Sequence, residues 1–334
     1  MATAKARPRA RERIAVEEGF MVPEVAAAAR ALDEKLGLAG PVSESRKAMF
    51  RDLSDLGDIR LKAMDEDGIT KQLIVISSPG VQAFDPVQGY ELSKLVNDRL
   101  AAACRAHPDR FAGLAAVAPQ APENAGRELE RAVKSLGLKG AHINSHTHGE
   151  YLDDKKFWPI FESAVALDVP IYIHPREPSP GLAKPLSMPG FRVAWGYAVE
   201  TGTHIMRLMA GGVFDRFPSL KIVIGHMGEN IPFSLERIDN RYLWEIGMAG
   251  LPRPMKRLPS EYFRDNIIVT TSGMNFRLPL MMTIEALGID NLLFAGDWPF
   301  EVVRDSVDVV DALPIPEADK QKLYADNAKR VFKL

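Results

Sequence analysis

The strongest constraint on the fold is the alternation of short apolar runs with longer stretches whose apolar residues recur every three or four positions. This alternation is typical of parallel β-α-β units. Eight such runs occur: IAVEEGF (14–20), KQLIVISSP (71–79), FAGLAAVAP (111–119), KGAHINSH (139–146), PIYIHP (170–175), KIVIGHMGE (221–229), NIIVTTSG (266–273) and NLLFAGDWPF (291–300). Eight strand-helix units predict one α/β domain, a single (β/α)8 TIM-like barrel over residues 14–334.

Two connections are too long for a plain strand-to-helix loop, residues 21–65 after the first strand and residues 176–200 after the fifth. Insertions at these places in a barrel cover the active site, so we expect both segments to shape a substrate pocket. An open doubly wound sheet is the structural alternative. It would bring a Gly-rich phosphate loop after the first strand, and the segment EEGFMVPE is not one.

The composition excludes several classes of function. The chain has 334 residues with 46% hydrophobic residues, which argues against general disorder, and its net charge is −2, which lacks the basic excess of a nucleic-acid binder. No apolar stretch is long enough to span a membrane. The single cysteine, Cys104, cannot form an internal disulfide, so a cytoplasmic protein is expected.

The first 13 residues, MATAKARPRARER, carry five basic residues and no apolar core of the signal-peptide type. We predict that residues 1–13 form a disordered basic head outside the fold, with a short organelle-targeting segment as the alternative.

Candidate site residues lie at the predicted carboxyl ends of the strands, the face that carries the active site in barrel enzymes. These are Glu17, His174, His226 with Glu229 three residues on, and Asp297. Two carboxylates and one imidazole, from Glu17, His174 and Asp297, are a suitable ligand set for one divalent ion. The alternative for each residue alone is a polar strand end that backbone groups satisfy.

Strand parity supports this grouping, because alternate residues of a strand share a face. Glu17 shares its face with Ala15, His174 with Tyr172, and Asp297 with Ala295. We therefore expect all three to point into the barrel mouth. His226 and Glu229 are spaced so that the carboxylate can orient the imidazole, although a capped strand end explains the pair as well.

Other residues are weaker candidates. An arginine can bind a substrate carboxylate and an aromatic side chain can line a pocket, although salt bridges and core packing explain such residues equally well. The candidates for substrate contact are Arg176, Arg237, Trp298 and Phe300, with Trp195 beside them. His142, Asn144, His146 and His148 around the fourth strand are the alternative for a second metal cluster, but alternation is lost where a strand becomes a loop.

Four motifs together resemble a known family: IAVEEGF, IYIHPREP, IGHMGENIPFSLERID and FAGDWPFE. They resemble the metal-dependent decarboxylase branch of the amidohydrolase superfamily, which includes the aminocarboxymuconate semialdehyde, γ-resorcylate, 2,3-dihydroxybenzoate and 5-carboxyvanillate decarboxylases. The resemblance extends from about residue 14 to the C-terminal VFKL, so it implies an amidohydrolase-type barrel over residues 14–334. INSHTHGEYLD and SSPGVQ look most like the carboxyvanillate enzymes, and HPREP like the dihydroxybenzoate enzymes.

The resemblance implies metal ligands at Glu17, His174 and Asp297, an acid/base pair at His226 and Glu229, and substrate contact at Arg237. Many relatives carry a histidine two residues after the first glutamate, where this chain has Gly19. Without that nitrogen ligand the site favours Mn²⁺, with Mg²⁺ or Zn²⁺ as alternatives. The bridging lysine of other superfamily members has no counterpart, so one ion is expected.

The implied reaction is nonoxidative decarboxylation of an ortho-hydroxybenzoate. A metal would hold the carboxylate and the neighbouring hydroxyl, Asp297 would protonate the ring carbon, and CO₂ would leave as the ring regains aromaticity. His226, oriented by Glu229, would relay charge, and Arg237 or Arg176 would hold a polar substituent.

Two rival functions stay open. One is metal-dependent hydrolysis of a lactone, amide or C–C bond on the same scaffold, and the other is a metal-free barrel that only binds an aromatic ligand. A small aromatic acid is the expected partner, together with further copies of the chain in a dimer or tetramer.

Overall fold

The structure is a computed structural model that describes residues 11–186 and 188–334. Most of the predicted basic head, residues 1–10, lies outside the described residues. Its last part contacts the domain: Arg11 Nη1 donates to Asp311 Oδ1 at 2.5 Å, and Arg13 Nη2 donates to Asp311 Oδ2 at 3.0 Å.

All the pairings between the assigned strands are parallel, and the strands follow one another in chain order around a ring. They are β1 (Ile14–Phe20), β2 (Lys71–Ile76), β3 (Phe111–Gly113), β4 (Ala115–Ala116), β5 (Ala141–Asn144), β6 (Ile171–His174), β7 (Ile222–Ile224), β8 (Ile267–Thr270) and β9 (Leu292–Leu293). The eight predicted runs all contain strands. The run 111–119 is divided at Leu114. The residues before it, in β3, pair with β2, and the residues after it, in β4, pair with β5.

The ring is assigned as two sheets, β1 to β3 and β4 to β9, and main-chain hydrogen bonds cross both breaks. Leu114 N–H donates to Ile74 O at 3.0 Å, and Val16 N–H donates to Phe294 O at 3.0 Å. The chain order of the strands and the surrounding helices confirm the predicted (β/α)8 barrel.

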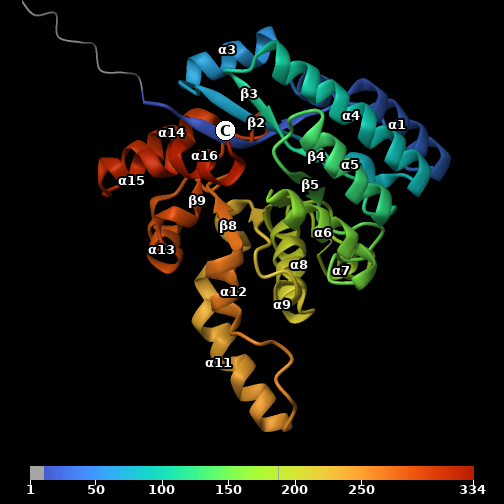
Figure 1. Ribbon diagram of the computed structural model, residues 1–334. Coiled ribbons are helices and arrows are strands. Elements are labelled where there is room, and N and C mark those ends of the chain that lie inside the picture. Colours follow the sequence, from blue (N-terminus) through green and yellow to red (C-terminus); the bar gives the residue numbers. More distant parts are fainter. Residues whose placement is uncertain (1–10, 187) are drawn as a thin grey trace, which may run out of the picture.

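Helices surround the strands, and α11 projects away from the rest of the molecule (Figure 1). The helices are α1 (Pro23–Leu36), α2 (Glu44–Ser54), α3 (Asp58–Asp67), α4 (Pro86–Ala106), α5 (Pro122–Lys134), α6 (Trp158–Leu167), α7 (Pro180–Leu186), α8 (Ala198–Ala210), α9 (Val213–Arg216), α10 (His226–Glu229), α11 (Ile231–Ala249), α12 (Pro259–Asn266), α13 (Arg277–Leu287), α14 (Val303–Asp311), α15 (Glu317–Gln321) and α16 (Asn327–Phe332). The described residues also form the 3₁₀-helices η1 (Gly80–Ala83), η2 (Lys155–Phe157) and η4 (Ile289–Asn291) and the π-helical segments η3 (Arg192–Tyr197) and η5 (Lys322–Asp326). None of the helices in the described ranges has the length and apolar character needed to cross a bilayer.

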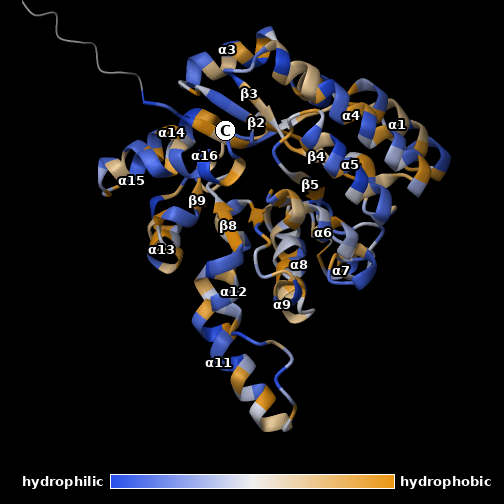
Figure 2. Ribbon diagram, in the orientation of Figure 1, coloured by the Kyte–Doolittle hydropathy of each residue, from blue (hydrophilic) through white to orange (hydrophobic). Residues whose placement is uncertain are grey.

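The strands are continuous apolar runs because both of their faces are buried. One set of side chains fills the barrel interior, including Val16, Val75, Tyr172 and Leu293, and Phe332 of α16 packs against this set. The other set packs between the strands and the helices, and the helices carry apolar and polar residues in alternation along their length (Figure 2). A packed interior leaves the ends of the strands as the place where polar side chains gather.

The predicted insertions have their own helices. Residues 21–65 hold α1, α2 and most of α3, and Leu53 of α2 lies beside Gly19 at the end of β1. Residues 176–200 hold α7, the π-helical segment η3 and the start of α8.

A buried polar network anchors the segment after β5 to α8. His204 Nε2 accepts the N–H of Leu152 at 3.1 Å, so the neutral ring carries its hydrogen on Nδ1, which faces Ser145 Oγ at 3.2 Å. Ser145 in turn donates to Glu200. Burial, aided by the charges of His146 and Arg207, lowers the pKa of His204 to about 3. His204 is therefore neutral in the native protein over most of the acid range.

This shift predicts a pH dependence of stability. Between pH of about 6.5, where an unfolded histidine titrates, and about 3, the unfolded chain binds a proton at His204 that the native chain does not. The free energy of unfolding should therefore fall as the pH drops through this window, with about 1.4 kcal/mol per pH unit due to this residue. Urea unfolding in chelator between pH 4 and 6.5 should show a shallower dependence for His204→Gln. Equal slopes for the two proteins would contradict this assignment.

Candidate metal centre and barrel mouth

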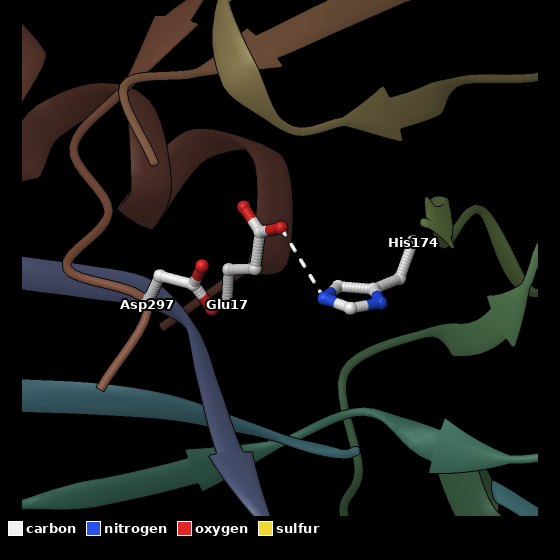
Figure 3. Close-up of side chains that lie close together, drawn as sticks. All are labelled: Glu17, His174 and Asp297. Carbon is white, nitrogen blue, oxygen red and sulfur yellow. Dashed lines mark ion pairs between the residues drawn. The ribbon is translucent and has the colours of Figure 1, made fainter. Parts of the chain in front are cut away.

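Three predicted ligands converge at the carboxyl end of the barrel: Glu17 of β1, His174 at the end of β6, and Asp297 in the segment after β9. One ligand atom from each lies within 4.8 Å of the others, and this is the only group of three such residues in ranges 11–186 and 188–334. Figure 3 shows the imidazole of His174 facing the Glu17 carboxylate, with Asp297 on the other side. The structure therefore brings together the ligand set expected from the sequence.

Glu17 reaches the mouth through a β-bulge. Val16 pairs with Leu73 and Glu18 pairs with Ile74, so Glu17 is an extra residue in the strand, and its φ is +78°. Glu17 points into the mouth as predicted, but the parity argument for it was wrong, because Ala15 belongs to the set packed between the strands and the helices. The bulge breaks the alternation and turns the Glu17 side chain inward. For His174 and Asp297 the prediction was correct, since Tyr172 and Ala295 both belong to the interior set.

One oxygen of the buried Glu17 carboxylate accepts two hydrogen bonds and the other accepts none from the described residues. Oε2 accepts from Thr270 Oγ1 at 2.8 Å and from the Tyr172 hydroxyl. Oε1 has no hydrogen-bond partner among the described residues. Burial raises the pKa of Glu17, against the opposing effect of the His226 and His174 imidazoles. A buried carboxylate with one free oxygen needs a further positive or donor group.

The Nε2 atom of His174 faces that oxygen. Its Nδ1 lies 2.7 Å from the carbonyl oxygen of Pro175, which can only accept, so the hydrogen is on Nδ1. When the ring carries this single hydrogen, the Nε2 lone pair faces Glu17 Oε1, 3.6 Å away. Two electron-rich atoms facing each other are the arrangement of metal ligands, and a carbonyl on the second nitrogen is the usual support of a ligating histidine. The residues therefore fit one divalent cation.

A side chain at Gly19 would have to displace neighbouring side chains. A Cβ at this position would lie 2.8 Å from Ser77 Oγ and 3.1 Å from side-chain atoms of Leu53 and Phe300. With two carboxylates and one imidazole, the donor set suits Mn²⁺, Mg²⁺ or Zn²⁺.

His226 and Glu229 lie in a left-handed turn, where the sequence predicted an extended run over 221–229. Strand β7 ends at Ile224, and the five residues 226–230 all have φ between +50° and +80°. This turn places His226 Nδ1 2.9 Å from Glu229 Oε1, while Nε2 faces Asp297 Oδ2 at 3.9 Å. Burial lowers the pKa of His226, but the Glu229 and Asp297 carboxylates oppose this and raise it well above its ordinary value.

The predicted aromatic residues Trp298 and Phe300 follow the candidate ligand Asp297 in the sequence. Trp298 is half-buried, and the guanidinium of Arg60 covers one face of its ring at 4.3 Å from the centroid. Phe300 is 45% exposed and its ring edge lies against Gly19. An apolar cavity of about 300 Å³ opens beside His226, lined by Met227, Phe233, Met274, Leu278 and Met282 among others.

The predicted arginines lie in different environments. Arg176 is half-buried; its Nη1 donates to His146 O at 3.0 Å, and its Nε has no partner among the described residues. Arg237 is exposed on α11.

The candidate cluster around the fourth strand forms no metal group in the described part of the chain. The Nε2 atoms of His146 and His148 lie near the carbonyl oxygens of Glu177 and Phe84. His142 lies in the barrel interior, with its ring centroid 5.4 Å from that of His174, and burial lowers its pKa well below the usual value.

The sequence reasoning missed a buried network around Glu18, formed with Gln72 and Arg60. Arg60 is fully buried, and it donates to the carbonyl oxygen of Gly19 at 2.6 Å and to Gln72 Oε1 at 3.1 Å. Gln72 Nε2 donates to Glu18 Oε2 at 3.2 Å. Burial raises the pKa of Glu18 to about 8 and lowers the pKa of Arg60 to about 10. The available signal was the second glutamate of the EEG sequence, whose partners lie more than 40 residues away.

A family model described as "Amidohydrolase" matches residues 41–334. Among curated proteins, the chain is 41% identical over 293 residues to γ-resorcylate decarboxylase of Polaromonas sp. (strain JS666), with 84% of this chain and 89% of that protein covered.

Solved structures agree in fold and in much of the sequence. The 5-carboxyvanillate decarboxylase from Sphingomonas paucimobilis superposes with a TM-score of 0.92 at 40% identity, covering 97% of this chain and 99% of that one. The enzyme of the same name from Novosphingobium aromaticivorans DSM 12444, in complex with manganese and 4-hydroxy-3-methoxy-5-nitrobenzoic acid, gives a TM-score of 0.91 at 36% identity, covering 97% and 96%.

The room for the Glu17 carboxylate depends on Gly225. A Cβ there would lie 2.7 Å from Glu17 Oε1, so Gly225→Ala should displace the carboxylate and reduce the Mn²⁺ retained after dialysis, measured by elemental analysis. Gly247→Ala on α11 is the matched control, because apart from its chain neighbours and the backbone of its own helix no described atom lies within 4 Å of its Cβ position. Equal metal content in the two variants would contradict the assignment of Glu17 as a ligand.

Proposed function

The chain belongs to the amidohydrolase family, and on this premise we propose that it is a metal-dependent, nonoxidative decarboxylase of an ortho-hydroxybenzoate. The substrate would be of the 5-carboxyvanillate or dihydroxybenzoate type. The observation that carries the proposal is the convergence of Glu17, His174 and Asp297 within 4.8 Å, with His226 directed at Asp297. Relatives that decarboxylate γ-resorcylate and 5-carboxyvanillate support the reaction class.

The proposed cofactor is one divalent ion, with Mn²⁺ favoured over Mg²⁺ and Zn²⁺, held by Glu17, His174 and Asp297. Support comes from the free Glu17 Oε1, from the His174 lone pair directed at it, and from the manganese in a related structure. When bound, such an ion supplies the positive charge that the two carboxylates require and the Lewis acidity that stabilises a phenolate.

The chain's own residues would manage the proton. Asp297 is the proposed donor to the ring carbon that bears the carboxylate; the C–CO₂ bond then breaks, its electron pair returns to the ring, and CO₂ leaves. His226 has a raised pKa and is hydrogen-bonded to Glu229. Its Nε2 lies 3.9 Å from Asp297 Oδ2, so we propose that it returns a proton to Asp297.

Four residues are proposed to contact the substrate. Phe300 and Trp298 would border the ring, since both follow Asp297 closely in the chain. Arg176 and Arg237 would pair with polar substituents, and the unpartnered Nε of Arg176 supports that role.

The competing function is hydrolysis of a lactone, amide or C–C bond, in which the same site would activate water and His226 or Asp297 would act as base. The products separate the two: decarboxylation of a benzoate releases CO₂ and a phenol, whereas hydrolysis consumes water and gives an opened or cleaved product. The aromatic-acid relatives favour decarboxylation.

Asp297→Asn tests the proposed proton donor. The variant should keep its far-ultraviolet circular dichroism, while CO₂ release from 5-carboxyvanillate, 2,3-dihydroxybenzoate or 2,6-dihydroxybenzoate falls by at least about 10²–10⁴-fold. Asp305→Asn, an exposed acid on α14, is the control and should turn over normally. Bound Mn²⁺ is measured in both proteins, and normal turnover by Asp297→Asn would rule Asp297 out as the donor.

A homo-oligomer, a dimer or a tetramer in the cytoplasm, is proposed as the working form. The projecting helix α11 exposes large apolar side chains, with Phe233 at 81%, Trp244 at 56% and Met248 at 71% exposure. A second copy of the chain is the occupant that the family favours.

Replacing Trp244 and Met248 together with glutamate should therefore shift the mass measured by light scattering to that of a monomer. Leu36→Glu on α1, also at an exposed apolar position, should leave the assembly intact. A monomeric wild-type protein would contradict the proposed assembly.

A further inference from the structure

The Glu18 carboxylate holds the backbone on both sides of Asp297. Gly296 N–H donates to Glu18 Oε1 at 2.8 Å, and Trp298 N–H donates to Glu18 Oε2 at 3.2 Å. Asp297 thus lies between two residues whose main-chain N–H groups both bind the buried Glu18 side chain.

The backbone of Asp297 needs such support. Its φ is +59°, in the left-handed region that is strained for a non-glycine residue. A second tie comes from Gly19, whose N–H donates to Trp298 O at 2.8 Å. These bonds fix where the Asp297 side chain leaves the chain relative to Glu17 on β1.

Glu18 is itself held from the other side. Gln72 Nε2 donates to its Oε2, and the buried Arg60 binds both Gln72 and the carbonyl oxygen of Gly19. Arg60 also covers the Trp298 ring, so the same network contacts the segment after β9 at side-chain as well as main-chain level.

The close fit leaves no room for a side chain at residue 296. A Cβ at Gly296 would lie 3.0 Å from Glu18 Oε1 and 2.7 Å from Val303 Cγ2. The glycine at residue 296 therefore lets the main chain come close enough to Glu18 for the hydrogen bond.

We propose that Glu18 is a positioning residue that sets the Asp297 carboxylate for metal binding and proton delivery, through the Gly296 and Trp298 amides. Glu18 acts through Asp297 and does not itself bind the ion. The inference rests on the proposed function, because it takes Asp297 as a metal ligand.

Glu18→Gln tests this role, because an amide nitrogen in place of one oxygen meets an N–H donor and removes an acceptor from the network. Mn²⁺ affinity is measured by titration of the free-ion electron paramagnetic resonance signal, without substrate. We expect the dissociation constant to rise by about 10- to 100-fold in a folded variant. Glu128→Gln is the matched control: Glu128 is buried and accepts from Asn97 at 2.7 Å, but it lies on α5. It should lose thermal stability and keep wild-type Mn²⁺ affinity.

The outcomes are distinguishable. If wild-type protein binds no Mn²⁺, the proposed function fails at its metal site. If wild type binds Mn²⁺ and Glu18→Gln binds it equally well, the positioning role is overturned while the proposed function stands. If Glu18→Gln does not fold, Gln72→Leu decides, since it removes one donor to Glu18: weaker Mn²⁺ binding supports the role and unchanged binding overturns it.

Discussion

The buried carboxylate of Glu17 is the interaction on which the barrel mouth depends. Burying an ionised group costs several kcal/mol unless partners compensate it. Here two hydroxyl groups, from Tyr172 and Thr270, bind one oxygen, and the other oxygen faces the His174 lone pair. The described residues donate to one oxygen of this carboxylate and leave the other without a hydrogen-bond partner, and this second oxygen is the one that the proposed cation would bind.

Backbone strain is concentrated at the same place. Glu17, His226, Glu229 and Asp297 all have positive φ, which costs non-glycine residues about 1–3 kcal/mol each. The neighbouring strands hold these residues in place, because the apolar side chains of the strands are buried in the barrel. The bulge directs Glu17 inward, and the left-handed turn brings His226 and Glu229 to one side. The geometry of the mouth thus comes from departures from regular strands, supported by a regular barrel beneath them.

Much of the barrel could be predicted from the sequence, because each strand is a distinct apolar run and parallel strands place their carboxyl ends on one face. Glu17, His174, His226 and Asp297 could be found for the same reason. The orientation of Glu17 could not, since a bulge shifts parity without a clear sequence signal. The Glu18 network was also out of reach, because Arg60 and Gln72 lie far along the chain and Arg60 stands in a charged helix that reads as solvent-facing. The sequence around Arg237 also does not indicate that this residue is exposed on the projecting helix α11.

The central claim is that residues from β1, from β6 and from the segment after β9 form one cation site. Anomalous diffraction at the manganese edge, from crystals grown with MnCl₂, tests it most directly. The account predicts one peak per chain, bonded to Glu17 Oε1, His174 Nε2 and a carboxylate oxygen of Asp297. No peak at this position, or a strong peak held by other residues, would contradict it.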